Sequence, residues 1–165
     1  MTDTKCRQCP NGTKYEHYSF LGGYEWDVLK AREITAGRKA DRQVTPDELR
    51  KYGLQIDPPK VGPNGERYIS MMFHSDEHLA HIPEEKLAEP IIFAPIIVGD
   101  STSYILIDGN HRAVRLAREG KVVPAIILTP QESFDCFVMK FTPKDRRRMK
   151  LFPGLRTKKK VQHVG

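Results

Sequence analysis

Three apolar runs with a polar turn between them place the strongest constraint on the fold of this 165-residue chain. The runs extend from Ile91 to Val98, from Tyr104 to Ile107 and from Val122 to Leu128. Continuous apolar runs of this kind are typical of strands that are buried on both faces and covered by helices. Between the second and third runs, residues 112–119 have the pattern of a short helix, which Gly120 closes. The sequence therefore predicts an α+β fold, with a small mixed β-sheet flanked by helices.

Other segments carry weaker signals of regular structure. Residues 26–34 have helical spacing, and residues 67–73 could form a further strand. A helix beginning at Thr45 and ending by Gly53 is better marked, because Thr45 can cap it and Glu48 completes a capping box. Pro83 indicates another helix start. We expect an N-terminal extension with short helices over residues 1–44, a core over residues 45–141, and a basic C-terminal helix and tail over residues 142–165.

The composition narrows the class of protein. Hydrophobic residues make up 39% and charged residues 29% of the chain, which is typical of a globular domain. No apolar run approaches the roughly 18 residues that span a bilayer, and the first residues lack the apolar stretch of a secretory signal. We therefore expect a cytoplasmic protein without a membrane partner. The three cysteines do not make a disulfide framework, and the net charge of +6 favours polyanionic partners.

The turn after the second run is the best candidate for a functional site. Asp108 ends the predicted strand, Gly109 permits close approach of the backbone to a ligand, and the helix begins directly afterwards. The N–H groups and positive dipole end of a helix attract anions, and phosphates in particular. His111 and Arg112 would add a titratable donor and a guanidinium fork suited to phosphate oxygens. The simpler alternative is that Asp108 caps the helix while His111 and Arg112 are solvated.

Three linked blocks of this region resemble the core of the ParB/sulfiredoxin superfamily. They are Pro95 to Val98, Tyr104 to Ala113 with its Asp-Gly-Asn-His-Arg turn, and Gly120 followed by Val123 to Ile127. The resemblance covers Ile91 to Thr129 and implies a fold of the ParB/sulfiredoxin type. It also implies nucleotide phosphates, ATP before others, at the turn. Members of this superfamily include partition proteins, sulfiredoxins, free-serine kinases and ParB-like nucleases or ATPases of plasmids.

The resemblance implies roles for the turn residues. Gly109, Asn110, His111 and Arg112 would bind phosphate, Asp108 would hold Mg²⁺, and Asp108 and His111 would be catalytic. A general base would come from one of four upstream glutamates, namely Glu77, Glu84, Glu85 and Glu89. Asn110 stands where sulfiredoxins have their reactive cysteine, so sulfinic-acid reduction is not expected. The residues after the core are also too few for the helix-turn-helix region of partition proteins together with a dimerisation domain, so that arrangement is not expected.

Several clusters outside the turn have competing interpretations. Cys6 and Cys9 could ligate zinc but are more simply incidental thiols, and His74, His78 and His81 could bind a metal or form a solvated segment. Arg115 and Arg118 are expected on the solvated face of the central helix. The basic C-terminal residues could bind DNA nonspecifically or only solubilise the chain; they are Arg146, Arg147, Arg148, Lys158, Lys159 and Lys160.

The sequence thus predicts a ParB-like, nucleotide-binding protein with phosphoryl chemistry, either an ATPase or a DNase-like hydrolase acting on DNA, as in plasmid or phage proteins. A noncatalytic DNA-associated regulator, or a conjugation or partition factor, switched by nucleotide is one alternative. A small-molecule kinase of the free-serine-kinase type is another.

Overall fold

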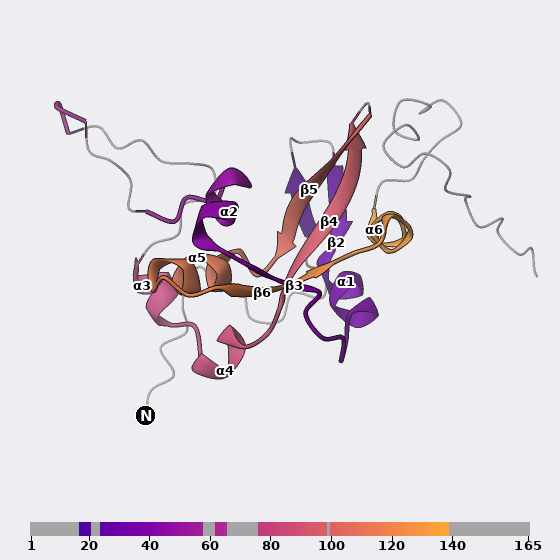
Figure 1. Ribbon diagram of the computed structural model, residues 1–165, viewed down its shortest axis with the longest axis horizontal. Helices are drawn as coiled ribbons and strands as arrows, with labels where there is room; N and C mark the ends of the chain where they lie inside the picture. Colours follow the sequence, from indigo (N-terminus) through magenta and orange to yellow (C-terminus); the bar gives the residue numbers. More distant parts are fainter. Residues whose placement is uncertain (1–16, 21–23, 58–61, 66–75, 99, 139–165) are drawn as a thin grey trace, which may run out of the picture.

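A four-stranded mixed sheet organises the chain, as seen in a computed structural model that describes residues 17–20, 24–57, 62–65, 76–98 and 100–138 (Figure 1). The strands lie in the order β3-β6-β4-β5. They are β3 (Arg42–Val44), β4 (Ile91–Val98), β5 (Ser101–Asp108) and β6 (Val123–Ile127). The β4–β5 and β3–β6 pairs are antiparallel, and β4 and β6 are parallel. A separate antiparallel hairpin joins β1 (His17–Phe20) to β2 (Tyr24–Asp27).

Six helices occur in the described segments. They are α1 (Val28–Ile34), α2 (Pro46–Lys51), α3 (Asp76–Ala80), α4 (Glu84–Leu87), α5 (Asn110–Arg118) and α6 (Pro130–Cys136). In Figure 1, α2 to α5 gather on one side of the sheet, and α1 and α6 lie on the other. None of these helices has the length and apolar character that crossing a membrane requires.

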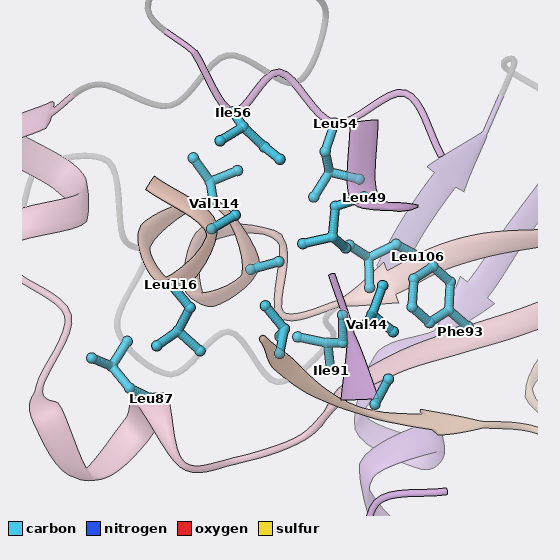
Figure 2. Packing of buried hydrophobic residues seen from close by; sticks show 14 of the residues in the cluster. Val44, Leu49, Leu54, Ile56, Leu87, Ile91, Phe93, Leu106, Val114 and Leu116 are labelled. Carbon is cyan, nitrogen blue, oxygen red and sulfur yellow. The ribbon is translucent and has the colours of Figure 1, made fainter. Parts of the chain in front are cut away.

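Two hydrophobic clusters are buried, one on each face of the sheet. Successive side chains along a strand point to opposite faces, so β4 and β5 contribute to both clusters. Phe93 and Leu106 pack in the cluster that α2 to α5 cover, whereas Ile92 and Ile107 pack in the other cluster. Figure 2 shows the first cluster, where side chains from α2 and α5 converge on those of β4 and β5. Trp26 is fully buried in the second cluster, near α1 and α6. Because both faces are covered, the strands can be continuously apolar, which explains the pattern in the sequence.

The structure confirms a small mixed sheet flanked by helices. The capping box at Thr45 is also confirmed, since its side chain accepts from the backbone of Glu48 while Glu48 bonds back to the backbone of Thr45. The helix predicted from residue 26 begins two residues later, at Val28. Trp26 and Asp27 instead end β2, and the Asp27 side chain caps α1 by accepting from the backbone N–H of Lys30 at 3.0 Å.

Two further differences from the predicted elements concern strands. β5 begins at Ser101 rather than Tyr104, because its first residues are exposed and are held by pairing with β4 instead of by apolar burial. β3 lies within residues 1–44, the predicted extension, yet it pairs with β6 at the edge of the main sheet. The predicted strand over residues 67–73, the basic residues 146–148 and 158–160, and the pair Cys6 and Cys9 lie outside the described residues.

Candidate functional site

The turn between β5 and α5 is built around Gly109. Its φ of +88° is in the left-handed region, and a Cβ there would lie 2.6 Å from the Cγ2 of Ile91 and 2.9 Å from Nη2 of Arg112. Only glycine therefore combines this backbone conformation with the close contact to β4. The turn begins α5 at Asn110, whose first N–H groups have no partner within the helix itself.

The carboxylate of Asp108 lies behind this turn and is held by two arginines. Arg32 on α1 donates from Nε to Oδ2 at 3.0 Å and from Nη2 to Oδ1 at 2.6 Å, which is a bidentate contact. Arg112 on α5 donates from Nη2 to Oδ2 at 3.2 Å and to the carbonyl oxygen of Pro90 at 3.1 Å. A distant segment, α1, thus meets the β5–α5 turn at one carboxylate.

The environment keeps Asp108 ionised. Burial raises its pKa, but the hydrogen bond from Arg32 and the positive charges of Arg112 and Arg32 outweigh burial, so that the net pKa lies below its ordinary value of 3.8. A carboxylate with a lowered pKa is a weak general base at neutral pH. The role that fits this geometry is to orient the two guanidinium groups.

A pocket of about 560 Å³ opens beside this carboxylate. Four cationic side chains line it, together with the carboxylates of Asp108 and Glu89. The cations are Arg32, Arg38, Lys86 and Arg112, and the remaining lining comes from Thr35, Ala36, Gly37, Pro90, Ile92 and Ile126. The pocket therefore combines an excess of positive charge with an apolar wall from β4 and β6. Its volume lies within the roughly 300–1,000 Å³ of small-molecule sites.

The structure places the predicted turn residues unequally around this pocket. Asp108 and Arg112 line it, whereas Gly109, Asn110 and His111 lie on the same turn but are not among its lining residues. Among the described residues, the buried Oδ1 of Asn110 and the buried Nε of Arg112 have no hydrogen-bond partner.

The four glutamates proposed as general base are also separated. Glu89 lines the pocket and pairs with Nζ of Lys86 at 2.7 Å, while its other oxygen lies 3.6 Å from Nη1 of Arg112. Glu84 instead pairs with Arg115, outside the lining of the pocket. Glu77 and Glu85 are exposed and do not line it. Of the four, Glu89 is the one that lines the pocket.

The residues present do not fit a dedicated magnesium site at Asp108. Both of its oxygens accept from guanidinium groups, and the described residues contain no group of three or more histidine, cysteine or acidic side chains arranged to hold a metal ion. Cations next to a carboxylate oppose the binding of a further cation there. We therefore assign no protein ligand to Mg²⁺.

The expectation that Arg115 and Arg118 form a solvated face is wrong. Their side chains are 19% and 21% exposed, and each ties a preceding segment to α5. Arg115 bonds to Glu84 and to the carbonyl of Ile82, and Arg118 bonds to Asp76 on α3 and to the carbonyl of Ile56 at 2.6 Å. These arginines bond α5 to α3, to α4 and to the backbone at Ile56 and Ile82.

Sequence reasoning missed three of the cations that line the pocket. Arg32 and Lys86 lie on short helices without a recognisable motif, and Arg38 follows α1. Arg38 is held by Glu132 on α6 and by Asp41, at 3.3 and 2.9 Å, and donates to the carbonyl of Ile127 at 3.1 Å. Their convergence depends on tertiary contacts, so no local pattern in the sequence signals it.

The histidine cluster is only partly within the described residues. His74 lies outside them, and the same is true of the side chain of His78. Nδ1 of His81 is 2.6 Å from the carbonyl oxygen of Glu77, a contact within the α3 turn. Cys136, on α6, is buried, and burial raises the pKa of its thiol to about 11, so it remains a protonated core residue.

Comparison with known proteins gives one distant match and no assigned activity. The chain is 34% identical over 97 residues to the uncharacterized protein MJ0188 of Methanocaldococcus jannaschii. The matched region is 57% of this chain and 36% of that protein, so the chain spans about a third of the length of the curated relative it matches. No family model and no solved structure matches the chain.

Proposed function

We propose that the pocket beside the β5–α5 turn binds the phosphate groups of a nucleotide, with ATP as the first candidate. The observation that carries this proposal is the convergence of four cationic side chains on one pocket next to the start of α5. Guanidinium groups match phosphate oxygens in geometry, and the dipole of α5 adds attraction for an anion at its N-terminal end. The resemblance to the ParB/sulfiredoxin superfamily points to the same turn.

The remaining wall of the pocket suits the rest of a nucleotide. Pro90, Ile92 and Ile126 provide apolar surface, and Thr35 provides a polar side chain near the end of α1. A mostly apolar wall with a few placed polar groups is typical of small-molecule sites. A ligand with one charged end and one flat, weakly polar end fits a pocket that has cationic side chains on one part and apolar side chains on the rest.

Hydrolysis of a phosphate bond is the reaction that we propose for this site. Glu89 accepts the proton of the attacking water, and Arg32 and Arg112 offset the charge on the phosphate as the bond to the leaving group breaks. Phosphoryl transfer depends mainly on positioning and charge stabilisation, which arginines supply. The two candidate sources of the phosphate are ATP and DNA, and the net charge of +6 supports DNA as a partner. Mg²⁺ would enter bound to the nucleotide.

A second candidate is a noncatalytic regulator that uses the bound nucleotide as a switch. The pairing of Asp108 with two arginines favours it, because this carboxylate is then unavailable as a base or metal ligand. In that case the pocket binds nucleotide without turnover, and the response passes to DNA contacts elsewhere on the chain. Turnover separates the two candidates.

The test is binding and turnover of ATP, ADP, CTP and GTP by the purified chain with Mg²⁺, with and without DNA. Arg112→Ala and Arg112→Lys should lose binding, while Arg50→Ala, which removes an exposed arginine of α2, should not. Phosphate release or DNA cleavage that Glu89→Gln abolishes supports the enzyme. Release of a phosphorylated small molecule would indicate a kinase instead. Equal nucleotide affinity in wild type and Arg112→Ala would show that this pocket is not the nucleotide site.

A further inference from the structure

The two arginines that bond to Asp108 differ in how far their side chains are exposed to solvent. The side chain of Asp108 is 8% exposed and that of Arg112 is 12% exposed, but that of Arg32 is 42% exposed. All three residues line the pocket. The carboxylate of Asp108 is therefore the buried end of the Arg32–Asp108 pair, and Arg32 is the solvent-exposed end that lines the pocket.

The bidentate contact fixes the plane of the Arg32 guanidinium. Two parallel N–H···O bonds, at 3.0 and 2.6 Å, define the orientation of the group in a way that one bond cannot. A lysine in the same place would offer a point charge without this fork. The ordering of a long side chain before a ligand arrives lowers the entropic cost of binding.

The charges on this cluster remain unbalanced after the internal pairing. Among the described residues at this corner of the pocket, the three cations Arg32, Arg112 and Lys86 face the two carboxylates of Asp108 and Glu89. The buried Nε of Arg112 has no hydrogen-bond partner among the described residues. Lys86 and Glu89 form a further pair beside them. An incoming anion meets a net positive, preorganised surface, because the carboxylate behind the arginines has already fixed their positions.

We propose that Arg32, carried by α1, is a second phosphate-binding arginine of the pocket, and that Asp108 is the positioning residue that holds Arg32 and Arg112 as one clamp for a doubly charged terminal phosphate. This proposal rests on the proposed function. In this proposal Asp108 positions the two arginines instead of holding a metal ion. Arg32, which is distant in sequence from the turn, joins the phosphate site. Of the two kinds of phosphate considered above, this clamp favours the terminal phosphate of a nucleotide, for which ADP and pyrophosphate are test ligands, over the singly charged diester of DNA.

The test uses pyrophosphate as the probe, with binding measured by calorimetry on the full chain. Arg32→Gln and Arg32→Lys should each weaken binding by roughly 10- to 100-fold, since a charge-assisted contact is lost or loses its geometry. Arg50→Gln is the matched control, because Arg50 is as exposed as Arg32 and is also paired with carboxylates, but it does not line the pocket. Methylguanidinium added to Arg32→Ala should restore part of the lost affinity, which a purely structural role would not allow.

The role of Asp108 is tested by a double-mutant cycle. Asp108→Asn should weaken pyrophosphate binding, and adding Arg32→Gln to it should cause little further loss, because the two changes remove one clamp. Independent, additive losses would overturn the positioning role. Measurement at lower temperature keeps a destabilised Asp108→Asn variant folded, and the same cycle can be repeated with Arg32→Lys.

The two proposals fail in different ways. If wild type binds pyrophosphate and Arg112→Ala loses it while both Arg32 variants bind as wild type does, the clamp is wrong and the phosphate site stands. If the wild-type chain binds neither pyrophosphate nor any nucleotide, both proposals are wrong.

Discussion

At position 109 the backbone is left-handed, and the space where a side chain would begin is already filled by Ile91 and Arg112. We predict that Gly109→Ala lowers the free energy of unfolding by about 2–5 kcal/mol, from the left-handed conformation and the overpacking together. Gly120→Ala is the control, because Gly120 has a φ of +70° but no atom within 4 Å of its Cβ position, and it should cost only about 1–2 kcal/mol. Urea unfolding measures both, and equal losses would contradict the packing argument.

Asp108 should make a defined contribution to the pH dependence of stability. Its pKa is lowered in the folded protein, so the unfolded chain binds the proton more readily, and the contribution is fully present above the ordinary pKa of 3.8. It is lost as the pH falls further, through the folded pKa. The difference in unfolding free energy between wild type and Asp108→Asn should therefore shrink on acidification below pH 3.8. A difference that grows on acidification would contradict the pairing with Arg32 and Arg112.

At the scale of elements, a buried hydrogen-bond relay connects β2, α6 and β4. Nε1 of Trp26 donates to Oγ of Ser133 at 3.1 Å, and that hydroxyl donates to the carbonyl of Pro95 at 3.1 Å. Both Trp26 and Ser133 are completely buried. The relay therefore fixes α6 and the β1–β2 hairpin against the sheet, on the face that also carries α1.

We predict that Ser133→Ala destabilises the fold by roughly 1–3 kcal/mol, because it leaves the indole N–H of Trp26 buried without an acceptor. Ser103→Ala, on the exposed part of β5, should change stability by no more than about 0.5 kcal/mol. Thermal or urea unfolding followed by the fluorescence of Trp26, the single tryptophan of the chain, provides the measurement. A Ser133 variant as stable as the Ser103 variant would show that the relay contributes nothing.

The elements most visible in the sequence are those whose burial is continuous along the chain. β4, β6 and the apolar half of β5 are buried on both sides, so their composition alone indicates strands. β3 escaped prediction because only Val44 of its three residues is buried. Trp26 was placed in a helix because its spacing to Leu29 is helical, whereas tertiary contacts with Phe137 and Ser133 hold it at the end of β2.

At the scale of the whole molecule, the site is assembled from residues that are far apart in sequence. Asp108 and Arg112 could be predicted because a strand, a glycine and a helix start stand side by side in the chain. Arg32 could not, because 76 residues separate it from Asp108 and an exposed arginine on a short helix has no distinctive pattern. Local chemistry thus pointed to Asp108 and Arg112, which line the pocket, and the fold supplies its remaining cations.

The proposed phosphate site is tested most directly by the affinity of the purified chain for ADP and ATP, compared between wild type, Arg112→Ala and Arg50→Ala. We predict saturable binding in wild type and in Arg50→Ala, and a loss of affinity of at least about tenfold in Arg112→Ala. Folding of each variant is checked by the same urea transition. Undiminished binding by a folded Arg112→Ala, or no binding by wild type, would contradict the claim that this pocket is a phosphate site.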